Sequence, residues 1–383
     1  MILKLIVLSL YFSILLGIGY FASRRVTNIT DYYVGGKKLG YWIAALSARS
    51  TGESGWLLIG VTGMGALMGF SAFWIVVGEV LGVWISWQFM AKKFKRMTDE
   101  YNSITIPDFL VSHFKSTTHL IRIVSATALS LFVVIYVSAQ IDITGKTFES
   151  FLGFNYYTGI TIGFGIVVLY IFSGGFLAVA WSDFFQGSLM FIGLLLLPVV
   201  AYFSLSTDVS IINGIRDIDP GLLDIWGAGG FTLMNIVTVL GLLSIGIGFM
   251  GSPQVYVRFI AIKNTAEIEK GKWVAIVYTF LTDSAAVMIG ILGRYMLTKA
   301  GDNPEMILGN AGEDVLALVL GQVMPTLIIG VYIAAVLSAV MSTVDSLLLV
   351  ASSAVTRDFY QQILNPDVDE TKLMGLSKKI TLT

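Results

Sequence analysis

The chain has 383 residues, of which 56% are hydrophobic and 13% are charged; its formal net charge is −1 and its mean hydropathy is +0.81. Because a soluble domain carries roughly 25% charged residues, this composition excludes an ordinary soluble protein and indicates a membrane protein built from helices. The absence of cysteine excludes disulfides, thiolate metal sites and cysteine nucleophiles, and two histidines are too few for a histidine-rich metal centre.

Nine apolar stretches are long enough to cross a membrane, which needs about 20 apolar residues and at least about 17. They are residues 2–21, 39–68 (interrupted), 70–90, 121–143, 157–173, 184–205, 233–250, 274–297 and 315–352. The last stretch is too long for one straight crossing, so we expect it to tilt or to extend past the membrane interface. The sequence therefore predicts an all-α integral membrane protein with about nine transmembrane helices.

Basic residues alternate between the two sets of connections. Starting after the first helix, every second connection holds Arg24, Arg25, Lys37 and Lys38; Lys92, Lys93, Lys95, Arg96, Lys115 and Arg122; Arg258, Lys263, Lys270 and Lys272; and Arg357, Lys372, Lys378 and Lys379. The opposite set holds Lys4, Lys146, Arg216, Arg294 and Lys299. Because cytoplasmic loops accumulate Lys and Arg, we expect the N-terminus outside and the C-terminus of this chain in the cytoplasm.

Two segments lie outside the predicted spans. Residues 206–228 are polar and punctuated by Gly and Pro, so we expect an external loop with a short surface helix. Residues 365–379 contain no apolar run and predict a cytoplasmic linker. Residues 380–383 look like the start of a tenth helix, so we expect a C-terminally truncated chain.

The second span is interrupted by Arg49-Ser50-Thr51-Gly52-Glu53-Ser54-Gly55. A non-helical break inside a membrane survives only against protein or a wet cavity. Two glycines, three hydroxyls and two charges are therefore typical of an ion or solute site. The alternative is a short loop between two half-length helices, or a helix that tolerates glycine and packs closely.

A second interruption, Gly246 to Pro253, follows the long external loop. Two Gly/Pro-interrupted spans at corresponding positions of two halves indicate the midplane site of a secondary transporter. The first span enters from the inside and the second from the outside, as an inverted repeat demands.

The last span carries the densest polar cluster, formed by Ser342, Thr343, Asp345 and Ser346. Hard cations such as sodium prefer hydroxyl, carbonyl and carboxylate oxygens, and carbonyls near the first break can supply the remaining ligands. The alternative is that these hydroxyls bond to carbonyls one turn earlier in their own helix.

Ionisable residues inside the predicted spans are functional candidates because they are costly at membrane depth. They are Arg49, Glu53, Glu79, Asp142, Asp183, Asp283 and Asp345. Asp142, Asp183 and Asp283 can also lie near solvated helix ends, and Arg49 can pair with Glu53 four residues later. Glu79 should have a partner, which the sequence does not name.

Four motifs resemble the sodium:solute symporter family, and its sodium/proline branch most closely. They are residues 47–56 (SARSTGESGW), 174–183 (GGFLAVAWSD), 251–253 (GSP) with 258–259 (RF), and 339–343 (AVMST) continuing to 351–354 (ASSA). The resemblance implies a leucine-transporter-type inverted-repeat fold in one domain, residues 1–383. A leading helix at 2–21 would precede a first repeat at about 39–205 and an incomplete second repeat at about 229–383.

The resemblance also implies site residues. A sodium ion would be held by the backbone carbonyls of Ser50, Glu53 and Ala339 and by the hydroxyls of Ser342 and Thr343. Asp183, with Asp345 and Ser346, would form a second sodium site or line the exit path. The solute would lie beside Thr51, Ser54, Trp56, Tyr136, Gln140, Phe249 and Pro253.

Three positions depart from the proline transporters of the family, which carry an aspartate at Gly52, a tryptophan at Ile245 and a tyrosine at Phe249. Family members also have about thirteen helices, which is more than this chain offers.

The predicted function is sodium-coupled import of a small organic solute, proline or a related amino acid, across the plasma membrane. Sodium, the solute and the lipid bilayer are the expected partners, and nucleic acid is not. Alternatives are a sodium symporter for a sugar, carboxylate, sialic acid or pantothenate, a non-transporting sensor domain, and a channel, which would need a continuous polar pore. The sequence shows no nucleophile and base in a catalytic pattern, so it does not indicate an enzyme.

Overall fold

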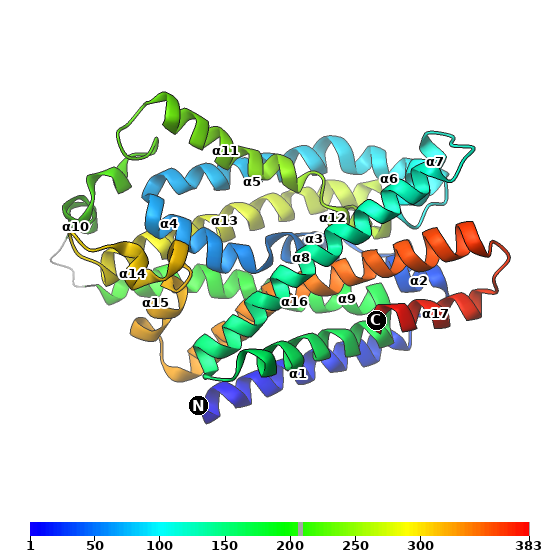
Figure 1. The fold of residues 1–383 in the computed structure, drawn as a ribbon, viewed down its shortest axis with the longest axis horizontal. Coiled ribbons are helices and arrows are strands. Elements are labelled where there is room, and N and C mark those ends of the chain that lie inside the picture. Colours follow the sequence, from blue (N-terminus) through cyan, green and yellow to red (C-terminus); the bar gives the residue numbers. More distant parts are fainter. Residues whose placement is uncertain (206–209, 383) are drawn as a thin grey trace.

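The computed structural model describes residues 1–205 and 210–382, and the described chain is helical apart from its loops and one isolated bridge between Leu39 and Ile262. Figure 1 shows the helices side by side in an elongated bundle. Short 3-10 and π-helical segments are labelled η. The elements are α1 (Ile2–Ser23), α2 (Ile29–Val34), η1 (Gly35–Lys37), α3 (Tyr41–Trp56), η2 (Leu57–Val61), α4 (Thr62–Met68), η3 (Gly69–Ala72), α5 (Phe73–Ile85), η4 (Ser86–Met90), α6 (Ala91–Glu100), α7 (Ile106–His113), α8 (Leu120–Leu152), α9 (Tyr156–Ser204), α10 (Ile211–Ile218), η5 (Pro220–Leu223), α11 (Leu233–Phe249), α12 (Pro253–Ala261), α13 (Thr265–Leu297), α14 (Pro304–Leu308), η6 (Asn310–Gly312), α15 (Val315–Val323), α16 (Thr326–Ser353), η7 (Ala354–Leu364) and α17 (Glu370–Leu382).

Two of the longest helical stretches double back on themselves. The stretch Tyr41–Glu100 has 60 residues and would be about 90 Å long if straight. Instead, Gly69 turns it at a φ of 60°. Its two ends therefore meet, since Lys37 Nζ, just before its start, lies 3.3 Å from Asp99 Oδ1, near its end. Gly175 turns α9 in the same way, at a φ of 53°. Glycine suits both turns because it adopts positive φ without a steric penalty.

The number of crossings stays a prediction. Within residues 1–205 and 210–382, six helical stretches are long and apolar enough to span a membrane, and the pair α11 and α12 makes up to seven. The two stretches that double back each contain two of the predicted spans. The nine predicted apolar stretches fall in helix apart from a few terminal residues and the break at Met324 and Pro325.

Prolines mark two further breaks in the second half of the chain. The second interruption expected from the sequence is present, because α11 and α12 are bent by 40° and Pro253 is the first residue of α12. The expected unbroken span at 315–352 is wrong. Met324 is extended before Pro325 and separates α15 from α16, since the residue before a proline is pushed out of the helical region.

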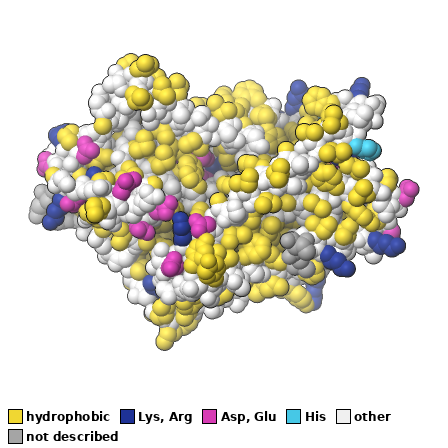
Figure 2. Space-filling model, viewed as in Figure 1, with side chains coloured by type: hydrophobic (Ala, Val, Ile, Leu, Met, Phe, Trp, Pro, Cys, Tyr) yellow, Lys and Arg dark blue, Asp and Glu magenta, His cyan; other side chains and the backbone are white. Residues whose placement is uncertain are grey.

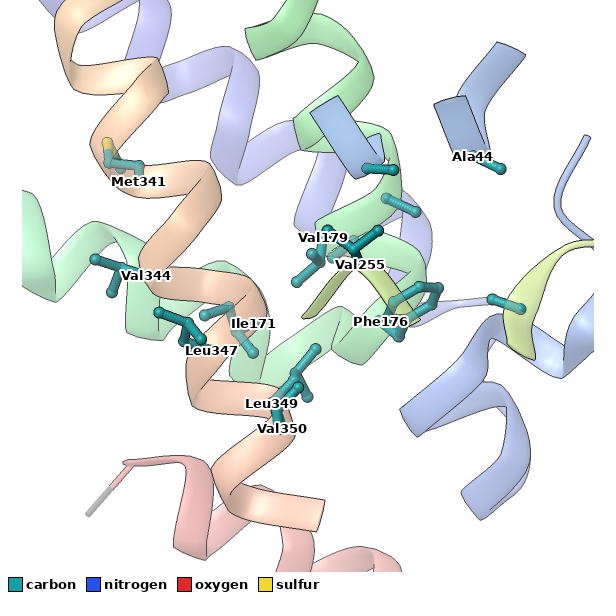
Figure 3. Packing of buried hydrophobic residues seen from close by; sticks show 14 of the residues in the cluster. Ala44, Ile171, Phe176, Val179, Val255, Met341, Val344, Leu347, Leu349 and Val350 are labelled. Atoms are coloured by element: carbon teal, nitrogen blue, oxygen red, sulfur yellow. The ribbon is translucent and has the colours of Figure 1, made fainter. Parts of the chain in front are cut away.

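The core lies where α16 packs against α9, α1, α3 and α8. Leu347 of α16 and Ile171 of α9 belong to one buried cluster, which Figure 3 shows from close by. A second close contact joins α5 to α11, where Gly78 and Gly82 face Gly246. Small residues of this kind let helix backbones approach closely in membranes.

Charged side chains gather at the two ends of the bundle. On the face seen in Figure 2, Lys and Arg gather at the end that carries α7 and α17, and Asp and Glu gather near α14 at the opposite end. The predicted cytoplasmic connections touch one another, because Lys37 pairs with Asp99 and Arg357 Nε lies 3.3 Å from Asp108 Oδ2. These contacts place the basic connections on one side, and the orientation in the membrane stays a prediction.

Of the two connecting segments, one differs from the expectation and the other agrees with it. The predicted linker 365–379 is mostly helical, because α17 packs Leu373 into the core and Thr381 Oγ1 donates to Ser352 Oγ at 2.8 Å. The external loop carries the expected short helix, α10, and residues 206–209 of that prediction lie outside the described residues.

Candidate ion and solute site

The first break is narrower than the sequence indicated. Residues 50–53 are helical, and the non-helical residue of α3 is Ser54, with φ 54° and ψ −179°. This conformation is almost restricted to glycine and costs on the order of 1–3 kcal/mol elsewhere. Side chains take over the backbone donors at this point, since Gly55 N donates to Gln140 Oε1 at 3.1 Å and Trp56 N donates to Ser54 Oγ at 3.2 Å.

Hydroxyls of α16 meet backbone carbonyls of α3 directly before this break. Ser342 Oγ donates to the carbonyl of Ser50 at 3.0 Å, and Thr343 Oγ1 donates to the carbonyl of Thr51 at 3.0 Å. In a regular helix these two carbonyls would accept from the N–H groups of residues 54 and 55, which are the residues that the break displaces. The carbonyl of Ala339 accepts from both hydroxyls, at 3.3 and 3.1 Å.

The resulting group contains four of the five predicted sodium ligands. Ser50, Ala339, Ser342 and Thr343 are fully buried and converge. The fifth, Glu53, takes part in none of these hydroxyl contacts, and its carbonyl accepts the N–H of residue 57. The hydrogen bonds from Ser342 and Thr343 to Ala339 lie within α16, as the alternative interpretation of these hydroxyls predicted. They are present together with the contacts to α3.

The carbonyl of Thr51 is an additional oxygen that the sequence did not assign to sodium. The side chain of Thr51 is buried, and its Oγ1 has no hydrogen-bond partner within the described part of the chain. A buried hydroxyl without a partner is costly, which suits a position that a cation or a solute completes.

Asp183 lies in a second buried network that an arginine organises. Arg258 Nη2 donates to Asp183 Oδ2 at 2.7 Å, and Ser47 Oγ donates to the same oxygen at 2.5 Å. Arg258 also contacts Ser346, whose hydroxyl donates to Asp345 Oδ1 at 3.0 Å. The sequence grouped the two aspartates with Ser346 but missed Arg258 as the cation that pairs with Asp183, although Arg258 stood in the third motif.

Arg49 pairs with two carboxylates, and a third carboxylate lies beside them. It pairs with Glu53 one turn later, as the ion-pair alternative predicted, and its Nη2 lies 3.3 Å from Glu79 Oε2 on α5. Arg49 is therefore the partner of Glu79 that the sequence did not name. Asp283 is not at a helix end, since it is buried in the middle of α13 beside Glu53 and Glu79.

A cavity of about 640 Å³ lies between α3, α8 and α15. Three predicted solute residues line it, namely Trp56, Tyr136 and Gln140. The other four, Thr51, Ser54, Phe249 and Pro253, are not among the residues that line it. Phe249 instead lies against Gly52, and the Arg49 guanidinium carbon is 4.6 Å from the centre of its ring. Lys146 and Glu313, 3.7 Å apart, also line this cavity.

Comparison with known proteins places this geometry in a family. The model of the sodium:solute symporter family matches residues 32–383. The chain belongs to the sodium:solute symporter family. It is 36% identical to the high-affinity proline transporter PutP of Bacillus subtilis over 95% of this chain and 75% of that protein. It is 33% identical to the sodium/proline symporter of Escherichia coli over 95% of this chain and 72% of that protein.

Solved structures show the same fold. A Na⁺-coupled sialic acid symporter in a substrate-bound, outward-open state matches with a TM-score of 0.82 and 21% identity, over 99% of this chain and 78% of that chain. Mhp1, a nucleobase-cation-symport-1 family transporter in a closed conformation, matches with a TM-score of 0.54 and 14% identity, over 93% and 74%. The predicted all-α transporter fold and the family are confirmed, and this symporter-family chain is a multi-pass membrane protein.

Proposed function

We propose that this family member is a sodium-coupled symporter that imports proline or a closely related amino acid across the plasma membrane. Relatives named as proline transporters and sodium/proline symporters at 33–36% identity support this reading. The observation that carries it is the contact of two α16 hydroxyls with two α3 carbonyls beside the break at Ser54. An oxygen-rich, dry junction of two helices is what a hard cation requires.

In this proposal sodium arrives from outside and binds between α3 and α16. Its ligands are the carbonyls of Ser50, Thr51 and Ala339 and the hydroxyls of Ser342 and Thr343. Bound sodium replaces the direct contacts between the helices and holds the break in the conformation that forms the solute site. Coupling is then reciprocal, because sodium raises the affinity for solute and solute raises the affinity for sodium by the same factor.

The solute occupies the cavity beside the same break. Gln140 links the two sites, since it lines the cavity and accepts from the N–H of Gly55. Trp56 and Tyr136 offer apolar faces for an aliphatic ring, and Lys146 and Glu313 lie at the predicted outer side. The membrane potential adds about 2.3 kcal/mol per 100 mV for each charge that enters with the solute.

The division into two repeats is also proposed, with the halves at residues 39–205 and 229–383. The two interrupted helices lie side by side at one end, because Leu39 before α3 bridges to Ile262 after α12. Leu39 N donates to the carbonyl of Ala261 at 3.1 Å, and Lys263 N donates to the carbonyl of Leu39 at 2.9 Å. This pairing supports corresponding roles for α3 and α12.

Uptake of radiolabelled proline by proteoliposomes that contain the chain tests the function. We expect proline to accumulate under an inward sodium gradient and not under an equal potassium gradient. A panel with other amino acids and sialic acid measures selectivity, and liposomes without protein provide the background. Equal proline uptake in sodium and potassium would contradict sodium coupling, and preference for another solute would contradict the proline assignment.

A further inference from the structure

The side chains of a buried charge cluster between α3, α5 and α13 play no part in the sodium site that we propose above. Its members are Arg49, Glu53, Glu79 and Asp283, which are between 0% and 5% exposed. One carboxylate oxygen from each of the three acids lies within 4.8 Å of the others. Three carboxylates therefore face a single guanidinium in a region from which water is excluded.

Ion pairing in this cluster is incomplete. Arg49 is shared between Glu53 and Glu79, and within the described residues Asp283 makes no ion pair. Thr282 Oγ1 donates to Asp283 Oδ1 at 3.3 Å, whereas Asp283 Oδ2 has no partner in the described chain although it is fully enclosed. An isolated ionised carboxylate is not stable in a buried interior, so it takes up a proton, pairs with a cation or coordinates a metal.

We propose that Glu53, Glu79 and Asp283 hold a second sodium ion beside Arg49. The spacing permits this, because an ion of the size of Ca²⁺ binds oxygen at about 2.4 Å, and three oxygens within 4.8 Å of one another can all contact one such ion. Sodium has nearly the radius of calcium and prefers the same hard oxygen ligands. The orphan Oδ2 of Asp283 is the atom that the ion satisfies.

The position of the cluster connects this second ion to solute binding. Glu53 and Arg49 lie on α3, on either side of Ser50 and Thr51, whose carbonyls we propose as sodium ligands. Arg49 also covers the ring of Phe249 at the end of α11. An ion held here ties α3, α5 and α13 together next to both interrupted helices. This inference rests on the proposed symport and sets its stoichiometry at two sodium ions per solute.

Equilibrium binding of radioactive sodium to the purified chain tests the proposal without solute. We expect two sodium ions per wild-type chain and one per Asp283→Asn chain, because that substitution keeps the shape and removes the unpaired charge. Ser342→Ala should also leave one ion, and the double variant should leave none. Asp302→Asn, which changes an exposed acid in a loop, is the matched control and should keep both ions.

Each alternative to the second site predicts a different number of bound sodium ions per chain. One ion in the wild type, lost in Ser342→Ala and kept in Asp283→Asn, overturns the second site and leaves the proposed function standing. The second site is also overturned if the second ion is lost in Asp345→Asn and retained in Asp283→Asn. That ion would then lie in the buried network of Arg258 and Asp183. Proton uptake at the cluster with no change in the sodium count overturns the second site as well. No sodium binding in any variant contradicts the proposed function itself.

Folding of the Asp283→Asn chain is checked by its elution as a single species and by the one ion that it retains. The Hill coefficient of sodium-dependent proline uptake gives an independent readout, which should fall from about two to about one in this variant. An unchanged Hill coefficient in Asp283→Asn contradicts the proposal even if total uptake falls.

Discussion

Replacing Gly246 by alanine should separate α5 from α11. A Cβ on Gly246 would lie 1.8 Å from the carbonyl oxygen of Gly78 and 2.3 Å from its carbonyl carbon. Carbon and oxygen atoms in contact need roughly 3.3 Å, so the two backbones must move apart by roughly 1.5 Å. The obstacle is backbone, which no rotamer change relieves.

The magnitude follows from two opposing effects. Overpacking costs typically about 1–3 kcal/mol, and alanine returns up to about 1 kcal/mol through its better helix propensity. Because the clash is with backbone, we expect a net loss of about 2 kcal/mol for Gly246→Ala. Gly248→Ala is the matched control on the same helix, since its Cβ meets nothing within 4 Å, and it should be neutral or slightly stabilising.

Thermal unfolding of the two purified variants, followed by proline uptake, measures the effect. Gly246→Ala should lower the unfolding midpoint by several degrees and reduce uptake, because α11 carries Phe249 and leads into the second interruption. Gly248→Ala should match the wild type in both assays. Equal midpoints for the two variants would refute the close contact between α5 and α11.

Three further substitutions probe the two sites. Ser54→Gly should raise the unfolding midpoint, because glycine adopts φ 54° and ψ −179° without a strain on the order of 1–3 kcal/mol; a lower midpoint would show that the side-chain bond of Ser54 matters more. Gly52→Ala places a Cβ 2.3 Å from the ring of Phe249 and should cost about 1–3 kcal/mol, which Phe249→Leu in the same chain should largely restore; no restoration would place the clash elsewhere. Asp183→Asn leaves Arg258 buried without its counter-ion and should lower the free energy of unfolding by about 3–5 kcal/mol. The double variant Asp183→Leu with Arg258→Met should lose less. Equal losses in the single and the double variant would contradict the ion pair.

The broad fold could be predicted because hydrocarbon imposes a simple rule. Every backbone polar group must be satisfied inside the membrane, so long apolar runs become helices and polar interruptions become breaks. The interruption before Pro253 and the polar cluster at Ser342 and Thr343 followed from composition alone. The family and the all-α transporter fold also followed from four short motifs.

Other features depend on contacts between distant segments and could not be read from the chain. The unwound residue is Ser54 because Gln140 and the Ser54 hydroxyl together satisfy the neighbouring N–H groups. The partner of Asp183 is Arg258, 75 positions away in sequence. The partner of Glu79 is Arg49, 30 positions away. Side chains at such separations have no local pattern that pairs them.

Two errors have local causes that the sequence did contain. Pro325 interrupts the last apolar run, which hydropathy alone reads as continuous. The helix α17 was read as a linker because its composition is polar, although Leu373, Ser377 and Thr381 recur at a helical spacing and are all buried. Spacing was therefore a better guide than hydropathy in this segment.

The sodium dependence of proline uptake in Ser342→Ala and Thr343→Ala proteoliposomes tests the central claim most directly. Ser353→Ala is the control, because its hydroxyl donates to Val350 one turn earlier in the same helix. Both site variants should need a higher sodium concentration for half-maximal uptake than the wild type and the control. Wild-type sodium dependence in both Ser342→Ala and Thr343→Ala would contradict the site.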